Sequence, residues 1–149
     1  MDPQPGRAGS GVRAGSLKQE TRVPIDSDVD IVTARQRGRA LAQQMGFSNS
    51  HLTLIATAIS ELARNILLYA KKGELTLGID NDGGREGLVL VAHDQGPGIP
   101  DIARALEVGY STSGSLGLGL PGVRRLMDDF EIVSGVGRGT TVTATKWKR

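Results

Sequence analysis

The chain has 149 residues, enough for one domain with a single core but not for two. It contains no cysteine, which excludes disulfides and thiolate metal sites, and no apolar run that approaches the length needed to cross a bilayer. Four basic and two acidic residues within positions 1–22 account for the whole net charge of +2, so the rest of the chain is neutral. These features predict a cytoplasmic protein with neither a nucleic-acid nor a membrane partner.

The first half of the chain is expected to hold a leader, a strand and two helices. Residues 1–17 are rich in Gly, Pro, Ser and Arg and predict a disordered leader, which leaves residues 18–149 as the domain. The pattern then predicts a strand over Glu20–Ile25, a helix capped by Asp28 that runs to Met45 and ends at Gly46, and a second helix from Ser48 or Asn49 to about Ala70.

The second half is dominated by strands and glycine-rich connections. The expected order is strands Glu74–Asp80 and Gly87–Asp94, a short helix after Pro100, an irregular segment over 109–119, a helix over Leu120–Asp129, and strands Phe130–Val136 and Thr140–Trp147. Because the helices cluster early and consecutive strands follow, the sequence predicts an α+β fold in which a sheet packs against helices.

The second helix carries a polar stripe beside its apolar face. Glu61 and Asn65 are four residues apart and therefore point the same way, and Ala58 and Leu68 share their stripe. Such an acid–amide pair is more often solvent-exposed, but its apolar flanks are typical of the wall of a cleft. The core face is expected to consist of large side chains at three- and four-residue steps, namely Leu52, Ile55, Ile59, Leu62, Ile66 and Tyr69.

Two glycine-rich segments follow the predicted strands and helices. The first begins at Asp94, which ends a strand and precedes Gly96 and Gly98. A carboxylate there can accept a hydrogen from a planar ligand, and glycines allow backbone to approach that ligand closely. An ordinary turn explains this segment equally well when it is taken alone.

The second glycine-rich segment spans residues 111–121. Pro121 suits the first turn of the helix that follows, which places Gly117 and Gly119 at its N-terminus, where free N–H groups attract anions. Three interleaved leucines argue against a flexible linker, so this segment predicts a phosphate site. Walker, Rossmann and His-Arg-Asp kinase patterns are absent from the sequence, so a phosphate-binding protein here needs another architecture.

Taken together, these segments resemble the sequence boxes of the GHKL superfamily, which holds DNA gyrase, Hsp90, MutL, histidine kinases and anti-sigma-factor kinases. The resemblance covers about residues 20–149 and is most similar to the RsbT-type serine/threonine switch kinases of stressosomes. It rests on Glu61-x-x-x-Asn65, Asp94-x-Gly96-x-Gly98, Gly117-x-Gly119 and Gly139-Thr140, and on stretches 57–65, 94–102, 110–114, 119–123 and Lys146-Trp147.

This resemblance implies a fold, a cofactor and a set of site residues. The fold would be a two-layer Bergerat sandwich, with a mixed, mostly antiparallel sheet covered on one face by helices. Asn65 would hold Mg²⁺ on the phosphates of ATP, Glu61 would be the general base, and Asp94 would accept from the adenine amino group with help from Thr140. Gly96 and Gly98 would lie against the base, and the lid over 109–119 would bring Ser113, Gly114, Gly117, Leu118 and Gly119 to the phosphates.

The lid contains no Lys or Arg, so the cation that meets the γ-phosphate besides Mg²⁺ is left open by the sequence. Arg64, Arg124 and Arg125 are the candidates, although a solvated role is the commoner one for each.

The resemblance also implies an activity and partners. The chain would be a protein serine/threonine kinase acting on STAS-domain proteins, such as a stressosome scaffold, and after release it would bind and activate a PP2C-type phosphatase. The main alternative is an anti-sigma factor of the same fold that sequesters a sigma factor. A gyrase- or MutL-like ATPase is disfavoured because little chain follows the last strand. A sensor histidine kinase is disfavoured because His51 and His93 occupy the wrong elements.

Overall fold

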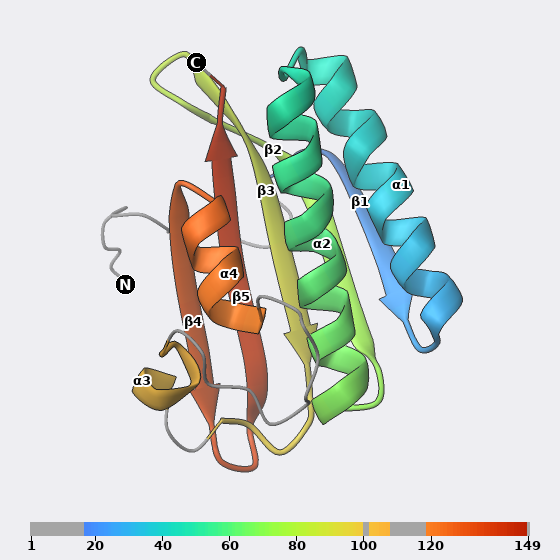
Figure 1. Cartoon of the computed structure of the whole chain (residues 1–149), viewed down its shortest axis with the longest axis vertical. Coiled ribbons are helices and arrows are strands. Elements are labelled where there is room, and N and C mark those ends of the chain that lie inside the picture. Colours follow the sequence, from blue (N-terminus) through green and yellow to red (C-terminus); the bar gives the residue numbers. More distant parts are fainter. Residues whose placement is uncertain (1–16, 100–101, 108–118, 149) are drawn as a thin grey trace.

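The computed structural model describes residues 17–99, 102–107 and 119–148, which form two layers (Figure 1). One layer is a five-stranded sheet in the order β1-β2-β3-β5-β4, and helices α1, α2 and α4 cover one of its faces. The elements are β1 Lys18–Ile25, α1 Asp28–Met45, α2 Asn49–Tyr69, β2 Gly73–Asp82, β3 Arg85–Asp94, α3 Ile102–Ala105, α4 Gly119–Leu126, β4 Asp129–Gly135 and β5 Gly139–Trp147.

The strand pairing confirms the predicted α+β sandwich. The pairs β1–β2, β2–β3, β3–β5 and β5–β4 are all antiparallel, so within the described residues the sheet is antiparallel throughout and not mixed as expected. The predicted leader lies outside the described residues except for Leu17, which is buried against Gly78 of β2.

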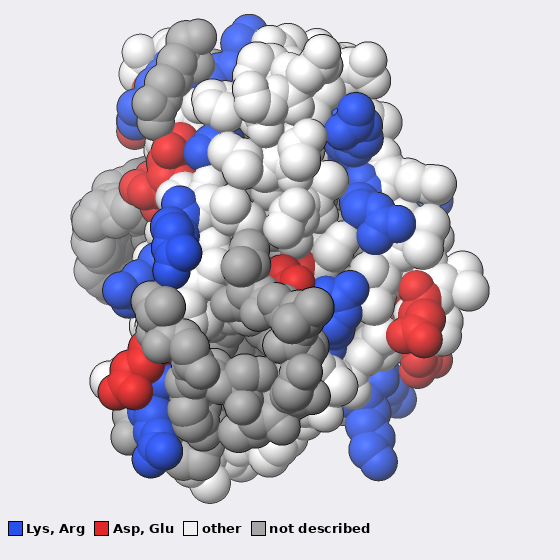
Figure 2. Space-filling model, in the orientation of Figure 1, with Lys and Arg blue, Asp and Glu red and all other residues white. Residues whose placement is uncertain are grey.

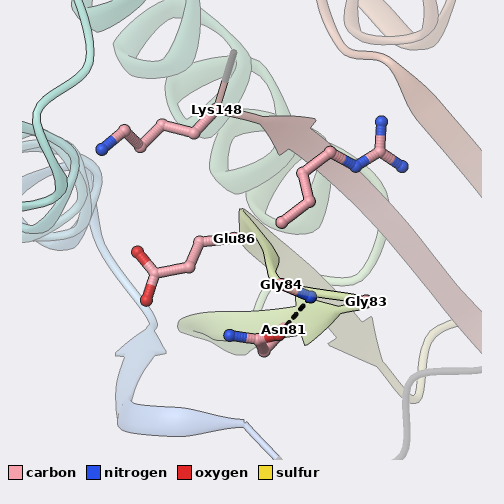
Figure 3. Close-up of a pocket in the computed structure, with 6 residues that line it drawn as sticks. Asn81, Gly83, Gly84, Glu86 and Lys148 are labelled. Atoms are coloured by element: carbon pink, nitrogen blue, oxygen red, sulfur yellow. Dashed lines mark hydrogen bonds between the residues drawn. The ribbon is translucent and has the colours of Figure 1, made fainter.

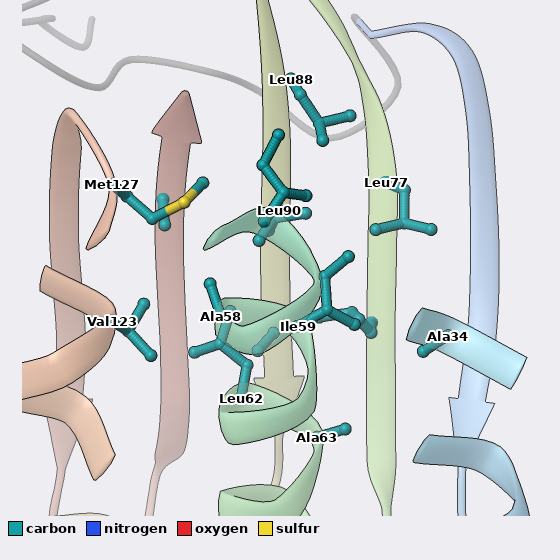
Figure 4. Packing of buried hydrophobic residues seen from close by; sticks show 14 of the residues in the cluster. Ala34, Ala58, Ile59, Leu62, Ala63, Leu77, Leu88, Leu90, Val123 and Met127 are labelled. Atoms are coloured by element: carbon teal, nitrogen blue, oxygen red, sulfur yellow. The ribbon is translucent and has the colours of Figure 1, made fainter. Parts of the chain in front are cut away.

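Helix α2 is the centre of the core. Ala58, Ile59 and Leu62 on α2 face the sheet side chains Leu77, Leu88 and Leu90, while Val123 and Met127 approach from the side of α4 (Figure 4). The predicted core face of α2 is wrong at one position, because Tyr69 is 51% exposed. Tyr69 is the last residue of the helix, and Ala70, which follows it, is already the C-cap.

Helix α2 also corrects the expectation that no segment is apolar enough to span a membrane. By length and composition alone this helix of 21 residues meets that requirement, because an 18-residue window within it has a mean hydropathy of 1.3. In this fold the helix packs against α1, α4 and the sheet, and half of its apolar window is buried. A helix that is covered on several sides in a soluble fold has the same apolar composition as a membrane span.

Two helix ends differ from the sequence-based expectation. Helix α1 is capped by Ser27, one residue before Asp28, and the Ser27 N–H donates to the Asp30 carboxylate at 3.0 Å. Helix α4 ends at Leu126, three residues before the predicted end at Asp129.

The early end of α4 follows from contacts with the last strand. Lys146 Nζ of β5 donates to the Leu126 carbonyl oxygen at 2.8 Å, and the Trp147 N–H donates to the Asp128 carboxylate at 2.8 Å. Trp147 Nε1 also donates to Asp129, at 2.7 Å. The chain after Leu126 is therefore bound to β5, and Asp129 begins β4 instead of continuing the helix.

Candidate active site

The structure brings Glu61 of α2 to the N-terminus of α4. Glu61 is only 8% exposed, and its Oε1 accepts a hydrogen bond from the Gly119 N–H at 3.2 Å. Gly119 is the first residue of α4 and has a φ of +58°, which favours glycine. An anion is stabilised at a helix N-terminus because the free N–H groups and the helix dipole point toward it. In this structure the Glu61 carboxylate is that anion.

The other oxygen of Glu61 is bound by an arginine of the same helix. Arg64 Nη1 donates to Glu61 Oε2 at 3.0 Å, and the Arg64 side chain remains 39% exposed. Arg124 and Arg125, on α4, are exposed. Of the three arginines considered for the γ-phosphate, Arg64 is thus the one in contact with the predicted catalytic acid.

Asn65 lies one helical turn beyond Glu61 and is half-buried. Within the described residues its side chain has no hydrogen-bond partner, so its carbonyl oxygen is available as a ligand of the hard type that Mg²⁺ prefers. The described residues contain no group of three or more His, Asp or Glu side chains that could hold a metal ion. Mg²⁺ commonly keeps waters and substrate phosphates as its other ligands, so one amide oxygen at this place fits such an ion.

The other end of the site is a row of four residues that crosses the sheet. Gly73 pairs with Asp94, Asp94 pairs with Thr140, and Thr140 pairs with Ser134, on strands β2, β3, β5 and β4. Leu88, Leu90 and Ala92 of β3 belong to the core, so alternation along the strand places Asp94 on the face that the helices cover. Val142 and Ala144 place Thr140 on that face in the same way.

Asp94 lies beside Gly73, at a place where the packing admits only glycine. Its Oδ1 accepts the Gly96 N–H at 2.8 Å, which fixes the side chain at the end of β3. A Cβ added to Gly73 would lie 3.1 Å from the Asp94 Cβ and 2.5 Å from the His93 carbonyl oxygen. Glycine at position 73 therefore allows β2 to lie close to the end of β3 and to Ile66 of α2. The sequence analysis did not identify Gly73 as a residue of the site.

Gly96 and Gly98 are each required by a protein neighbour. A Cβ at Gly96 would lie 2.6 Å from the Ala70 Cβ, at the end of α2. Gly98 has a φ of +84°, and a Cβ there would lie 2.1 Å from the Gly135 carbonyl oxygen. Both glycines thus let the loop after β3 pack against adjoining segments, and their expected contact with a nucleotide base remains a prediction.

Ser134 is a further residue that the sequence analysis missed. Its Oγ accepts the Ile99 N–H at 2.8 Å, donates to the Gly139 carbonyl oxygen at 3.1 Å and lies 2.8 Å from Thr140 Oγ1. It therefore joins the loop after β3 to the turn between β4 and β5. Nothing in the local sequence marks Ser134, because the loop residue that it binds is 35 positions away.

Part of the predicted lid is outside the described residues. This applies to Ser113, Gly114, Gly117 and Leu118, whereas Gly119 is described and begins α4 as expected. Both histidines have contacts away from this site. His93 Nδ1 lies 2.8 Å from Thr141 Oγ1 on the opposite face of the sheet, and the His51 ring packs edge-on against Phe47.

Two further features are the charge on the helix-covered face and a hollow at the other end of β3. Figure 2 shows basic and acidic side chains interspersed on the helix-covered face, with the basic ones more widespread in the described part of that view. A polar hollow of about 510 Å³ lies at the β2–β3 hairpin (Figure 3), lined by Asn81, Gly83, Gly84, Arg85, Glu86 and Lys148. Since Arg85 and Asp94 are the two ends of β3, this hollow is roughly 30 Å from Asp94 along the strand.

Comparison with known families gives the class of this domain directly. The histidine kinase-like ATPase domain matches residues 24–146, and the chain belongs to that family. Family membership implies the use of ATP and confirms the predicted GHKL resemblance.

Among individual relatives, the serine/threonine-protein kinase RsbT of Bacillus subtilis is 52% identical over 133 residues, covering 89% of this chain and 100% of the relative. This similarity confirms the predicted enzyme class, a protein serine/threonine kinase. The anti-sigma F factor of Geobacillus stearothermophilus is 30% identical and covers 76% of this chain and 81% of the relative.

A solved structure shows the same fold. The RsbU and RsbW domains of Rv1364c from Mycobacterium tuberculosis match 87% of this chain with a TM-score of 0.56 and 20% sequence identity. This chain spans about a third of that structure, 33% of its length, so the match concerns one fold unit within a larger protein.

Proposed function

We propose that this protein serine/threonine kinase transfers the γ-phosphoryl group of Mg·ATP to a serine or threonine of a STAS-domain protein, such as a stressosome scaffold. After release from that protein it would bind and activate a PP2C-type phosphatase in the cytoplasm. The observation that carries the enzymatic part is the convergence of Glu61, Asn65 and the N-terminus of α4. The STAS substrate and the phosphatase follow from the RsbT-type resemblance.

The chain's residues have separate roles in this reaction. The substrate hydroxyl oxygen forms a bond to the γ-phosphorus, the bond from that phosphorus to ADP breaks, and the hydroxyl proton passes to a carboxylate oxygen of Glu61. Asn65 would hold Mg²⁺, which when bound neutralises charge on the phosphates. Asp94 and Thr140 would hold the adenine at the other end of the cleft.

The contact of Glu61 with α4 uses a donor that a bound phosphate could also take. Glu61 Oε1 is bound to the Gly119 N–H, and that N–H is also a donor that a phosphate would take at the α4 N-terminus. A phosphate that accepts the Gly119 N–H therefore leaves Oε1 free to accept the substrate proton. Binding of the nucleotide and release of the base are in this way linked through one backbone donor.

The test is transfer of labelled phosphate from ATP to a purified STAS-domain protein in the presence of Mg²⁺. We expect label on serine or threonine of that protein with the wild type and with Glu131→Gln, a matched change at an exposed glutamate of β4. Glu61→Gln should slow transfer by about 10²–10⁴-fold, the usual contribution of a general base, and leave ATP bound. Asn65→Ala or a chelator should abolish transfer, because the phosphates lose their metal.

Two results would contradict this proposal. Label retained on His51 or His93 would show histidine chemistry instead of transfer to a protein hydroxyl. Equal transfer rates for Glu61→Gln and Glu131→Gln would remove Glu61 from the role of base.

An anti-sigma factor of the same fold is the second candidate function. It is favoured by anti-sigma F factor relatives that are 29–30% identical over 76% of this chain, whereas the kinase relative is 52% identical over 89%. Stable co-purification of a sigma factor with the full chain would favour this candidate. Co-purification of a STAS-domain protein or a phosphatase would favour the switch kinase.

A further inference from the structure

Ser134 occupies a central position among three segments at the base end of the proposed site. The Oγ atom contacts the Ile99 N–H, the Gly139 carbonyl oxygen and the Thr140 hydroxyl, at 2.8, 3.1 and 2.8 Å. Ser134 and Thr140 are directly paired on β4 and β5, and Thr140 is paired with Asp94 on β3. The serine is therefore one strand removed from the carboxylate that is expected to meet the base.

The directions of these hydrogen bonds follow from the hydrogens that each group has. A serine hydroxyl has one hydrogen and two lone pairs. The Gly139 carbonyl oxygen has no hydrogen, so Ser134 is the donor in that contact. The Ile99 N–H takes one lone pair of Ser134 Oγ, which leaves the second lone pair for the hydroxyl hydrogen of Thr140.

This arrangement determines what Thr140 can offer to a ligand. With its hydrogen directed to Ser134, the Thr140 hydroxyl has only lone pairs left for the cleft. The neighbouring Asp94, as an ionised carboxylate whose Oδ1 already accepts the Gly96 N–H, is likewise only an acceptor. Two adjacent acceptors can both bind a donor such as an exocyclic amino group. A carbonyl oxygen in the same place would be repelled, because it has lone pairs and no hydrogen.

We propose that Ser134 is a positioning residue that makes the base pocket selective for a 6-amino purine over a 6-oxo purine. It acts through Thr140 by fixing the direction of the threonine hydroxyl, and it need not touch the nucleotide. This inference rests on the proposed function, since it takes Asp94 and Thr140 as the groups that meet the base. Selectivity arises because a 6-oxo oxygen would face the Asp94 carboxylate and the Thr140 hydroxyl oxygen. All three atoms are acceptors, and none of them would have a hydrogen to share.

The experiment measures binding of ADP and of inosine diphosphate (IDP) to the full chain by calorimetry with Mg²⁺. These diphosphates differ at the 6-position and N1 of the base, and neither carries a γ-phosphoryl group to transfer. Ser134→Ala frees the Thr140 hydroxyl to turn its hydrogen toward a 6-oxo group. We expect the dissociation constant of IDP divided by that of ADP to fall by about tenfold relative to wild type. The fall would come mainly from tighter binding of IDP or weaker binding of ADP.

Thr143→Ala is the matched control, because it removes a hydroxyl from β5 on the sheet face opposite the helices. It should leave the ratio at the wild-type value. An unchanged ratio in Ser134→Ala, or an equal loss of affinity for both nucleotides, would overturn the positioning role, because Ser134 would then only hold the loop and turn together. A wild type that binds neither nucleotide would instead refute the proposed function, so the two failures are distinguishable.

Discussion

The two ends of the proposed nucleotide site are built in different ways. At the base end, Asp94, Thr140 and Ser134 stand on three neighbouring strands, and the loop and turn around them are held by several hydrogen bonds. At the phosphate end, Glu61 and Asn65 project from one helix, and the contact that links Glu61 to α4 is a single backbone hydrogen bond of 3.2 Å.

This difference separates recognition from catalysis. This row is rigid because Asp94 and Thr140 are paired on both sides, while Ser134, on the edge strand β4, is held by the hydrogen bonds of its hydroxyl. A rigid site suits selection of a base. In the proposed reaction a phosphate would take the Gly119 N–H from Glu61, and a single replaceable hydrogen bond suits such an exchange. Changes at the base end should therefore affect stability and binding together, whereas changes to Glu61 and Asn65 at the phosphate end should affect rate.

The largest effect is expected from Gly98→Ala at the base end. A Cβ there meets the Gly135 carbonyl oxygen at 2.1 Å, and the φ of +84° is itself unfavourable for alanine. We expect a loss of about 3 kcal/mol or more in unfolding free energy, measured by thermal or denaturant unfolding, together with weaker ADP binding.

Gly137→Ala provides the control for this prediction. It has a similar φ of +77° but nothing within 4 Å of the added Cβ, so only the backbone cost of about 1–2 kcal/mol applies. Equal destabilisation by the two variants would show that close packing against Gly135 is not what requires glycine at position 98.

An intermediate effect is expected from Lys146→Met, which affects the far end of α4. Lys146 is buried, and its ammonium donates to the Leu126 carbonyl oxygen at 2.8 Å and lies 3.6 Å from Asp128. Removing it leaves a carbonyl and a carboxylate without this partner, at a cost of about 1–3 kcal/mol in unfolding free energy. Lys72→Met, at an exposed lysine, should change stability by less than about 0.5 kcal/mol.

If α4 is anchored mainly at this end, Lys146→Met should also weaken ADP binding, since the position of Gly119 depends on the helix. Calorimetry with ADP measures this second effect. Wild-type affinity in a destabilised Lys146→Met protein would show that the Glu61–Gly119 contact alone positions the helix N-terminus.

The smallest effect is expected from Arg64→Gln at the phosphate end. The Arg64–Glu61 pair is an i,i+3 contact on one helix with the guanidinium 39% exposed, and such pairs contribute only about 0.3–0.5 kcal/mol. Unfolding free energy and transfer rate should both stay close to wild type, as they should for Arg124→Gln on α4. A rate loss comparable to that of Glu61→Gln would instead place Arg64 at the γ-phosphate.

Local sequence patterns predicted most helices and strands. They failed where contacts with distant residues decide where a helix ends or which of its side chains are buried. The start of α2 at Ser48 and the end of α1 at Gly46 follow from short-range capping and were expected. Tyr69 continues the apolar spacing of α2 and yet is exposed, because the helix stops beside it. The end of α4 was placed too late because Lys146 and Trp147 bind the residues after Leu126 from another strand.

The sequence by itself determined the acid–amide stripe of Glu61 and Asn65, the glycine boxes and the family, since each depends on residues a few positions apart. Only the tertiary structure decided that Gly119 lies on Glu61, 58 positions away, and that Ser134 joins the loop after β3 to Thr140. Hydrogen bonds between such distant residues depend on strand order and helix packing, which leave no periodic trace in the sequence. The proposed assignment of base and metal residues was thus available from the family resemblance, whereas the directions of their hydrogen bonds required the fold.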